Sequence, residues 1–301
     1  MLTDILRSDS STNSAKQHLS LLCSLPKYLP FILDKIDNQQ KKQYLLLHSL
    51  KEVIVRQSVD KADFDDSSVE KITNLLFNHC ESEEEGVCNA VAECLGKIAV
   101  IKPGKLVSAL KYPAAFTRAT VVIAVKYSIV ERQEKIAGIL YPEISYFLML
   151  IKDHDRHVSR AAVLALSTAA HNKPSLIKGL LPELLPFLYD QTVIKGPFKH
   201  TVDDGLELRK AAFECVDTLL DSCLDQVNTS SFIVPYLLSG LDDHYDVKMP
   251  GHLILSKLAD KCPSAVLAAL GSLVDPLQRT VHFKPKQNAV KQEVDRNEDD
   301  S

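Results

Sequence analysis

The sequence predicts an all-α fold of repeated helix pairs, a HEAT-type α-solenoid of the armadillo-like class. Three observations lead to this prediction. Leucine, alanine, isoleucine and valine dominate a chain of 301 residues in which 6% are aromatic and none is tryptophan, a mixture that favours helices. Similar stretches recur about every 41 residues, with apolar residues at helical spacing. No segment shows the strict apolar–polar alternation of a strand.

The repeated stretches have the pattern of a buried helix face. They are VCNAVAECL (87–95), FTRATVVIA (116–124), VSRAAVLAL (158–166), LRKAAFECV (208–216) and VKMPGHLIL (247–255), with a weaker copy ending at Leu50. Four of them carry a small residue at the fourth position, where two helices can approach closely: Ala90, Ala119, Ala161 and Ala211. Prolines at 103, 174 and 263 follow three of the stretches and end a helix, because proline lacks an N–H group.

The partner helix of each pair is expected between these stretches. The expected ranges are 28–37, 67–80, 105–112, 141–153, 180–190 and 230–243, with a last helix from Ser264 to about Val281. Hydroxyl or acidic residues precede several helices and are expected to cap them: Ser67 or Ser68, Glu83 to Glu85, and Asp203 with Asp204. Together these segments predict six or seven antiparallel helix pairs in one curved stack.

Three regions are expected along the chain. Residues 1–25 form a divergent, partly disordered N-terminus, residues 26–283 form the solenoid, and residues 284–301 form a polar tail that is too poor in apolar side chains to fold. Both natural ends of the solenoid are expected to be missing. Leu267, Leu270, Leu273 and Leu277 form an apolar surface on the last helix. Part of that surface should therefore lack a partner.

Composition and motifs argue against several classes of function. A net charge of −4 without a basic face disfavours nucleic-acid binding, and no apolar run approaches the length of a membrane helix. The N-terminus lacks a secretory h-region, and seven cysteines without a CxxC pair indicate a reducing compartment. No nucleophile–base set is found, so the sequence predicts no enzyme, no catalytic residue, no cofactor and no small-molecule substrate.

Three features allow a structural and a chemical interpretation. Cys94 and Cys215 occupy the same small repeat position, which predicts buried thiols, with metal or redox chemistry as the alternative. His154 and His157 lie near aspartates and could form a metal pair, but their place between two helices favours a solvated turn. The acidic run Glu81–Glu85 is interpreted as a solvated loop or helix start, with contact to a basic protein surface as the alternative.

Several longer segments resemble the C-terminal part of the CAND family, the cullin-associated, neddylation-dissociated proteins that are also described as TATA-binding-protein-interacting. These segments are QYLLLHSLKEVI (43–54), NHCESEEEGVCNAVAECLGK (78–97), AAHNKPSLIKGLL (169–181), GPFKHTVDDGLELRKAAFECV (196–216), DHYDVKM (243–249) and CPSAVL (262–267). The resemblance spans residues 26–298 and is nearest to plant members. Loop residues such as GPFKHTVDDG carry it, and a helical repeat does not require them.

The resemblance implies a cullin-binding regulator of SCF and other cullin–RING ubiquitin ligases in the cytoplasm and nucleus. Family members contact the cullin N-terminal region with their C-terminal repeats, and a projecting hairpin competes with the substrate-receptor adaptor. The corresponding residues here are Val193, Ile194, Lys195, Gly196, Pro197, Phe198, Lys199, His200 and Thr201. The alternative is another HEAT-repeat scaffold, such as a nuclear-transport or phosphatase-scaffold protein.

The chain departs from the family pattern at several points. The upstream repeats are absent, residues 1–25 do not match, and the chain stops at Ser301 where members continue. About ten residues are missing between Lys195 and Gly196, and a shorter gap is expected near Tyr112. We therefore expect weak cullin binding, slow adaptor exchange and no block of neddylation.

Overall fold

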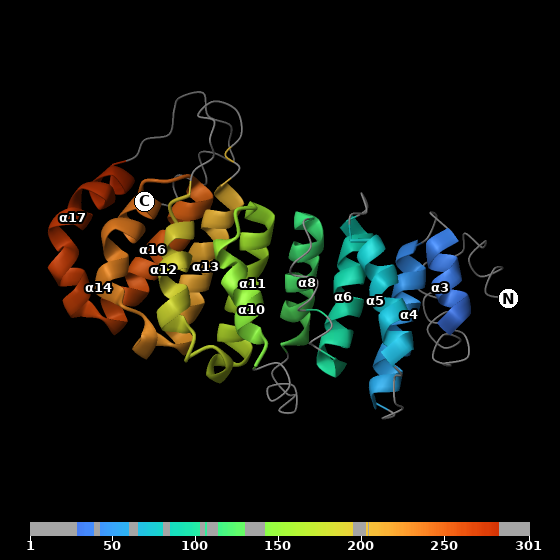
Figure 1. The fold of residues 1–301 in the computed structure, drawn as a ribbon. Coiled ribbons are helices and arrows are strands. Elements are labelled where there is room, and N and C mark those ends of the chain that lie inside the picture. Colours follow the sequence, from blue (N-terminus) through green and yellow to red (C-terminus); the bar gives the residue numbers. More distant parts are fainter. Residues whose placement is uncertain are drawn as a thin grey trace, which may run out of the picture. The chain divides into compact units, whose positions relative to one another are not determined.

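The computed structural model describes residues 29–38, 43–59, 66–80, 85–102, 106, 114–129, 142–194, 203 and 205–282. Every regular element in this part of the chain is a helix, and no strand occurs in it, so the all-α prediction is confirmed (Figure 1). The chain divides into two compact units, Met1–Leu150 and Ile151–Ser301. The expected N-terminal region and polar tail lie outside the described residues, and the single curved stack of six or seven pairs stays a prediction.

The first unit is built around a row of three long helices. Its helices are α3 (Leu29–Asn38), α4 (Gln43–Val59), α5 (Asp66–Asn78), α6 (Glu85–Ile101), α8 (Ala115–Ser128) and α10 (Ile144–Leu148). Helices α4, α6 and α8 lie side by side, while α3 packs against α4 and α5 packs against α6 (Figure 1). This is the arrangement of helix pairs that the repeats predict.

The second unit repeats the arrangement. Its α-helices are α11 (Arg156–Asn172), α12 (Leu181–Gln191), α13 (Leu206–Ser222), α14 (Thr229–Phe232), α15 (Leu238–Leu241), α16 (Tyr245–Lys261) and α17 (Pro263–Val281). A π-helical turn, η6 (Ile233–Leu237), joins α14 to α15, and the 3-10 turns are η3 (Met149–Lys152), η4 (Pro174–Leu176) and η5 (Leu224–Gln226). Helices α11, α13 and α16 form the row, α12 packs on α13, and α14, η6 and α15 pack on α17.

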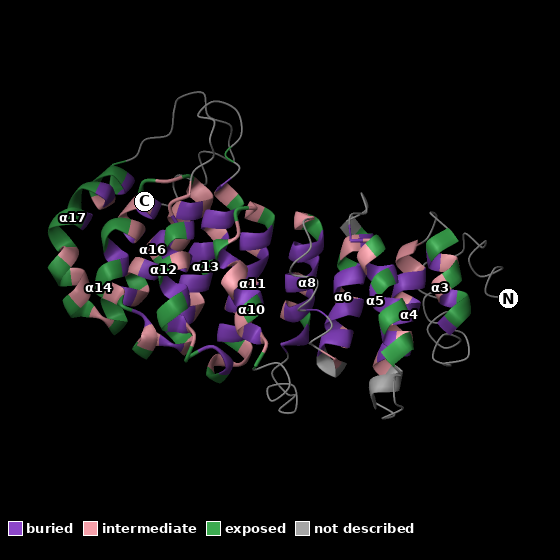
Figure 2. Ribbon diagram, in the orientation of Figure 1, coloured by how far each residue is buried: buried purple, intermediate pink, exposed green. Residues whose placement is uncertain are grey.

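Small residues occupy the contacts between neighbouring long helices. The four repeat alanines are all buried: Ala90, Ala119, Ala161 and Ala211. Figure 2 shows buried residues along α6 and α8 in one unit and along α11 and α13 in the other. The helices also end where the prolines predict, because α11 stops at Asn172 before Pro174 and α16 stops at Lys261 before Pro263. Pro103 lies outside the described residues.

Two of the expected partner helices are interrupted. The range 141–153 is regular only in α10, after which the chain tightens into the 3-10 turn η3. The range 230–243 is broken at Val234, whose backbone is extended (φ −120°, ψ 120°). Pro235 explains this break, because proline disfavours helical geometry in the residue before it. The expected helix 105–112 lies almost entirely outside the described residues.

One helix start differs from the expected caps. Helix α5 begins at Asp66, so Ser67 and Ser68 lie inside its first turn. The turn before α11 is solvated at its histidines, as predicted, because the His154 side chain is 91% exposed and His157 is exposed. The Asp153 side chain in the same turn is 8% exposed and accepts the N–H of Asp155 at 2.9 Å. Asp155 in turn accepts the N–H groups of His157 and Val158. These aspartates therefore shape the turn and cap the helix.

The two repeat-position cysteines are buried as predicted. Cys94 and Cys215 are both 0% exposed, and the Sγ of Cys94 donates to the carbonyl oxygen of Leu47 at 3.3 Å. Burial raises the pKa of Cys94 to about 12, an effect that nearby Lys51 partly opposes. Burial likewise raises the pKa of Cys215. Neither thiol carries an appreciable thiolate fraction at neutral pH.

This burial predicts selective labelling of the cysteines. Brief treatment of the native chain with N-ethylmaleimide should modify Cys88 and Cys262, which are half-buried, and leave Cys94 and Cys215 intact until denaturant is added. Peptide mass spectrometry measures the extent at each position. Modification of Cys94 as fast as Cys262 in the native chain would show that the α4–α6 contact opens readily.

The last described helix exposes part of its apolar face. On α17, Leu267 is 67% exposed and Leu270 is 46% exposed, whereas Leu273 is buried and Leu277 is half-buried. Val274 and Val281 extend the exposed stripe, and Figure 2 shows exposed residues along the helix. The expectation that part of this apolar surface lacks a partner is thus confirmed, because Leu267 and Leu270 are exposed while Leu273 packs inward.

We expect this stripe to drive self-association. Sedimentation velocity of the unmodified chain should show a sedimentation coefficient that rises with protein concentration, because association removes apolar surface from water. The double variant Leu267→Lys, Leu270→Lys should remain monomeric over the same range. Leu253→Lys is the control, since Leu253 is also exposed but lies on α16. A wild-type chain that stays monomeric throughout would contradict the prediction.

Candidate functional site

The segment that carries the predicted contact residues leaves the fold at the end of α12. The hydroxyl of Thr192 donates to the carbonyl oxygen of Tyr189 at 2.6 Å. The N–H of Val193 donates to the carbonyl oxygen of Asp190 at 3.3 Å. Val193 and Ile194 are half-buried in this turn. The other seven candidates, from Lys195 to Thr201, lie outside the described residues, so their contact role stays a prediction.

A buried arginine holds the two ends of this segment together. Arg209 lies on α13 and is 0% exposed. Its Nη1 donates to the carbonyl oxygen of Ile194 at 2.9 Å and to Oδ1 of Asp203 at 3.0 Å, and its Nη2 donates to Oδ2 of Asp203 at 2.5 Å. Residues 195–202 therefore leave and return beside a single guanidinium group.

The same arginine also reaches the turn before α16. Its Nε donates to Oδ2 of Asp243 at 2.7 Å and its Nη2 donates to Oδ1 at 2.8 Å, a bidentate pair with a carboxylate that is 7% exposed. All five N–H donors of Arg209 are thus used. We call Arg209 and its three partners, Ile194, Asp203 and Asp243, the arginine clamp.

Electrostatics keep the clamp charged. Burial alone would lower the pKa of Arg209, but hydrogen bonds and charge attraction from Asp203 and Asp243 outweigh it and raise the pKa above its ordinary value. The clamp joins one guanidinium to two carboxylates and one backbone carbonyl oxygen. The clamp is therefore a structural joint that fixes where the segment starts and ends.

Gly205 makes the close approach possible. A Cβ atom at this position would lie 2.5 Å from the carbonyl oxygen of Ile194 and 3.1 Å from Nη1 of Arg209. A larger residue would push the returning chain off the clamp. The sequence prediction that Asp203 serves as a helix cap is thus incomplete, because its carboxylate mainly binds Arg209, although it also accepts the N–H of Gly205. Asp204 lies outside the described residues.

Sequence reasoning did not find Arg209, although a signal was present. Arg209 stands directly after the first apolar residue of a repeat stretch and two residues before the buried Ala211. A charged residue on the buried side of a helix needs a partner, and acidic pairs precede both this helix and the next one. The sequence does not give the offset between neighbouring helices, which decides which aspartates lie within hydrogen-bond distance of Arg209.

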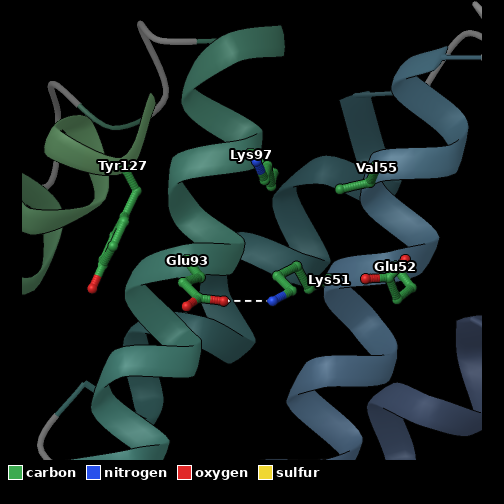
Figure 3. Close-up of a pocket in the computed structure, with 6 residues that line it drawn as sticks. All are labelled: Lys51, Glu52, Val55, Glu93, Lys97 and Tyr127. Carbon is green, nitrogen blue, oxygen red and sulfur yellow. Dashed lines mark hydrogen bonds and ion pairs between the residues drawn. The ribbon is translucent and has the colours of Figure 1, made fainter. Parts of the chain in front are cut away.

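The first unit contains a separate recess on its row of long helices. It has a volume of about 370 Å³ and is lined by residues of α4, α6 and α8: Lys51, Glu52, Val55, Glu93, Lys97 and Tyr127 (Figure 3). The Nζ of Lys51 lies 2.6 Å from Oε2 of Glu93 and bridges α4 to α6. No prediction from the sequence included this recess, because its walls come from three helices that are distant along the chain.

The described residues show no metal centre and no membrane span. Among them, no group of three or more His, Cys, Asp or Glu side chains is placed to hold a metal ion. None of the described helices is both long and apolar enough to cross a bilayer. The helix pairs of the two units define a HEAT-repeat protein.

Comparison with known proteins supports this class and specifies the family. Residues 176–301 match the TIP120 family model, described as "TATA-binding protein interacting (TIP20)". The chain is 66% identical to Cullin-associated NEDD8-dissociated protein 1 of Arabidopsis thaliana, over 99% of this chain and 29% of the relative. It is 45% identical to the protein of the same name from Dictyostelium discoideum, over 92% of this chain and 24% of the relative. This chain corresponds to the C-terminal part of the cullin-associated NEDD8-dissociated family, as its motifs predicted.

The solved structures show the fold. Importin beta superimposes with a TM-score of 0.68 over 97% of this chain and 39% of importin beta, at 14% sequence identity. An identity this low shows a shared helical-repeat fold and nothing of function. The chain is thus a HEAT-repeat protein that spans less than a third of the length of its named relatives.

The alignment also bears on the missing segments. The match to the Arabidopsis relative extends over 357 residues, and 357 − 301 = 56, so that relative carries at least 56 residues that this chain lacks. This total exceeds the roughly ten residues expected between Lys195 and Gly196 together with the shorter gap expected near Tyr112. A coverage of 99% also brings most of residues 1–25 into the alignment, beyond the range that the motifs defined.

Proposed function

We propose that this chain is a non-catalytic module that binds the N-terminal region of a cullin and regulates assembly of cullin–RING ubiquitin ligases. The observation that carries the proposal is 66% identity, over 99% of the chain, to a protein whose name states that it associates with cullins. The same resemblance supports a location in the cytoplasm and nucleus. No nucleic acid, membrane or small-molecule substrate is part of the proposal.

The proposed contact is the segment from Val193 to Thr201. The arginine clamp supports this assignment, because it holds Ile194 and Asp203, the described residues on either side of 195–202, on one guanidinium. A projecting loop on a rigid helical scaffold is a common way to present contact residues. The Arg209 and Asp243 side chains of the clamp are buried, so the clamp serves to position the ends of the segment.

Binding is tested with purified proteins. The full chain should bind an immobilised cullin N-terminal region weakly and should not bind a small GTPase. The GTPase represents the second candidate, a nuclear-transport function, which the fold shared with importin beta leaves open. Capture by the GTPase and not by the cullin would overturn the proposal.

Adaptor exchange should be slow because the projecting segment is short. Eight residues separate Ile194 from Asp203, and an out-and-back path of this length reaches at most about 13 Å at 3.3 Å per residue. A variant with a ten-residue hairpin inserted after Lys195 should release fluorescent adaptor from an adaptor-loaded cullin faster than the unmodified chain.

The control is a ten-residue glycine–serine insertion at the same place, which adds length without a defined hairpin. Equal release rates for the unmodified chain and the hairpin variant would show that another surface performs the exchange. Equal rates for the two insertions would show that length matters and hairpin structure does not.

A further inference from the structure

The recess in the first unit contains one cation and one anion that no described residue pairs with. Of its four charged side chains, Lys51 and Glu93 pair with each other at 2.6 Å. Lys97 and Glu52 form no ion pair or hydrogen bond with the described residues. Lys97 lies one helical turn after Glu93 on α6, yet Glu93 is committed to Lys51 on α4. The charge of Lys97 is therefore available to a ligand.

The charges of Lys97 and Glu52 lie on different sides of the recess. In Figure 3, Lys97 stands above the Lys51–Glu93 pair, between Tyr127 and Val55, whereas Glu52 lies at the far side of Lys51. A second cation reinforces the Tyr127 side, because the Nζ of Lys126 lies 5.4 Å from the centroid of the Tyr127 ring. Two lysines, Lys97 and Lys126, thus lie near this side of the recess, where the carboxylate of Glu93 is paired with Lys51.

Apolar surface flanks this side of the recess. The Tyr127 ring on α8 is 36% exposed, and Val55 on α4 is half-buried. A ligand group with an aliphatic stem and an anionic head fits such a site, because the stem can pack on Tyr127 and Val55 while the head reaches Lys97. The glutamate side chain has this form.

The lining also indicates the kind of molecule that carries the group. Small-molecule pockets are mostly apolar and enclosed, whereas four of the six lining residues here are charged and the recess is open. Two carboxylates in the lining repel a polyphosphate, which brings several negative charges, more than they repel a single carboxylate placed at Lys97. A volume of about 370 Å³ accommodates one or two side chains of a peptide segment.

We propose that this recess binds a glutamate side chain of an acidic segment in a partner protein, with Lys97 as the residue that pairs with its carboxylate. Tyr127 and Val55 pack against the stem, and the Lys51–Glu93 bridge holds the two walls at a fixed separation. The proposal concerns the first unit and does not depend on the cullin-binding proposal, which rests on the second unit.

The test uses two short fluorescein-labelled peptides and the full chain. One peptide has the sequence Ac-LEELEEL-amide, and the other replaces every glutamate with glutamine. Fluorescence anisotropy should show saturable binding of the glutamate peptide, at least about tenfold tighter than the glutamine peptide and weakened by salt. Lys97→Glu should weaken binding of the glutamate peptide at least about tenfold, and Lys97→Arg should retain it.

Lys210→Glu provides the matched control. Lys210 lies on the long helix α13 of the second unit, is half-buried like Lys97, and forms no ion pair with the described residues. Its substitution makes the same change in net charge and should leave binding unchanged. Circular dichroism checks that each variant folds. Absence of saturable binding, equal affinity for the two peptides, or equal loss in Lys97→Glu and Lys210→Glu would each overturn the proposal.

Discussion

Replacement of Arg209 by methionine is expected to destabilise the second unit by about 3–5 kcal/mol, the cost of leaving a buried charge without its partner. Methionine retains much of the length of arginine but supplies no donor. Asp243, which is 7% exposed, would then keep a charge that water cannot reach well. Asp203 is 40% exposed and can be solvated, so most of the loss should come from Asp243.

Urea denaturation followed by circular dichroism measures this loss, because the chain has no tryptophan to report by fluorescence. Hydrogen exchange at α13 and α16 should show faster exchange in the same variant and so place the change in the second unit. Lys210→Met is the control, since Lys210 neighbours Arg209 on the same helix and forms no ion pair with the described residues. A shift no larger than that of Lys210→Met would contradict the prediction.

A triple variant separates lost pairing from lost packing. Arg209→Met combined with Asp203→Asn and Asp243→Asn removes the unpaired charges and should recover part of the stability. Recovery would show that the uncompensated Asp243 charge caused the loss. If the triple variant is as unstable as Arg209→Met alone, the aliphatic stem and shape of arginine contribute most of the effect.

Gly240→Ala should be the second most damaging single change, with an expected cost of about 1–3 kcal/mol from overpacking. A Cβ atom at Gly240 on α15 would overlap Cζ of Phe213 and lie 2.8 Å from Cε1 and 2.9 Å from Cε2 of the same ring. The Phe213 ring on α13 is 0% exposed and meets Phe232 on α14 edge-on, with 6.1 Å between ring centroids. The ring therefore has no free space into which to move.

Gly271→Ala is the matched control for this substitution. Gly271 lies within α17 and is exposed, and a Cβ atom added there would have no neighbouring atom within 4 Å. Alanine there should leave stability unchanged or raise it by up to about 1 kcal/mol, because alanine favours helices over glycine. The same denaturation measurement applies to both variants.

Phe213→Leu in the Gly240→Ala background tests the cause directly. Leucine is smaller than phenylalanine and should relieve the contact, so this double variant should be more stable than the sum of the two single changes predicts. Additive losses, or a Gly240→Ala variant as stable as Gly271→Ala, would show that the two elements shift apart at little cost.

Local sequence determined most of the secondary structure. Apolar spacing and small residues place the long helices, because a helix side chain points to a face fixed by its position in the 3.6-residue turn. The burial of Ala161 and Ala211 and of the thiols Cys94 and Cys215 follows from that periodicity alone. Proline chemistry likewise accounts for the ends of α11 and α16.

The family resemblance was also carried by the sequence, through loop residues that no helical repeat requires. It identified the segment from Val193 to Thr201 as a candidate contact, and only Val193 and Ile194 of that segment are described by the structure. The break at Val234 could have been anticipated from Pro235, but the apolar pattern on either side concealed it.

Only the tertiary structure decided which distant residues meet. Arg209 binds Asp243, 34 positions away, Gly240 closes on Phe213, and the recess joins Lys51 to Glu93 across two helices. Periodicity fixes the face on which each residue lies, but not the rotation and sliding of one helix against the next. Those offsets depend on how side chains of both helices interlock, and a change of one residue in register would give Arg209 a different partner.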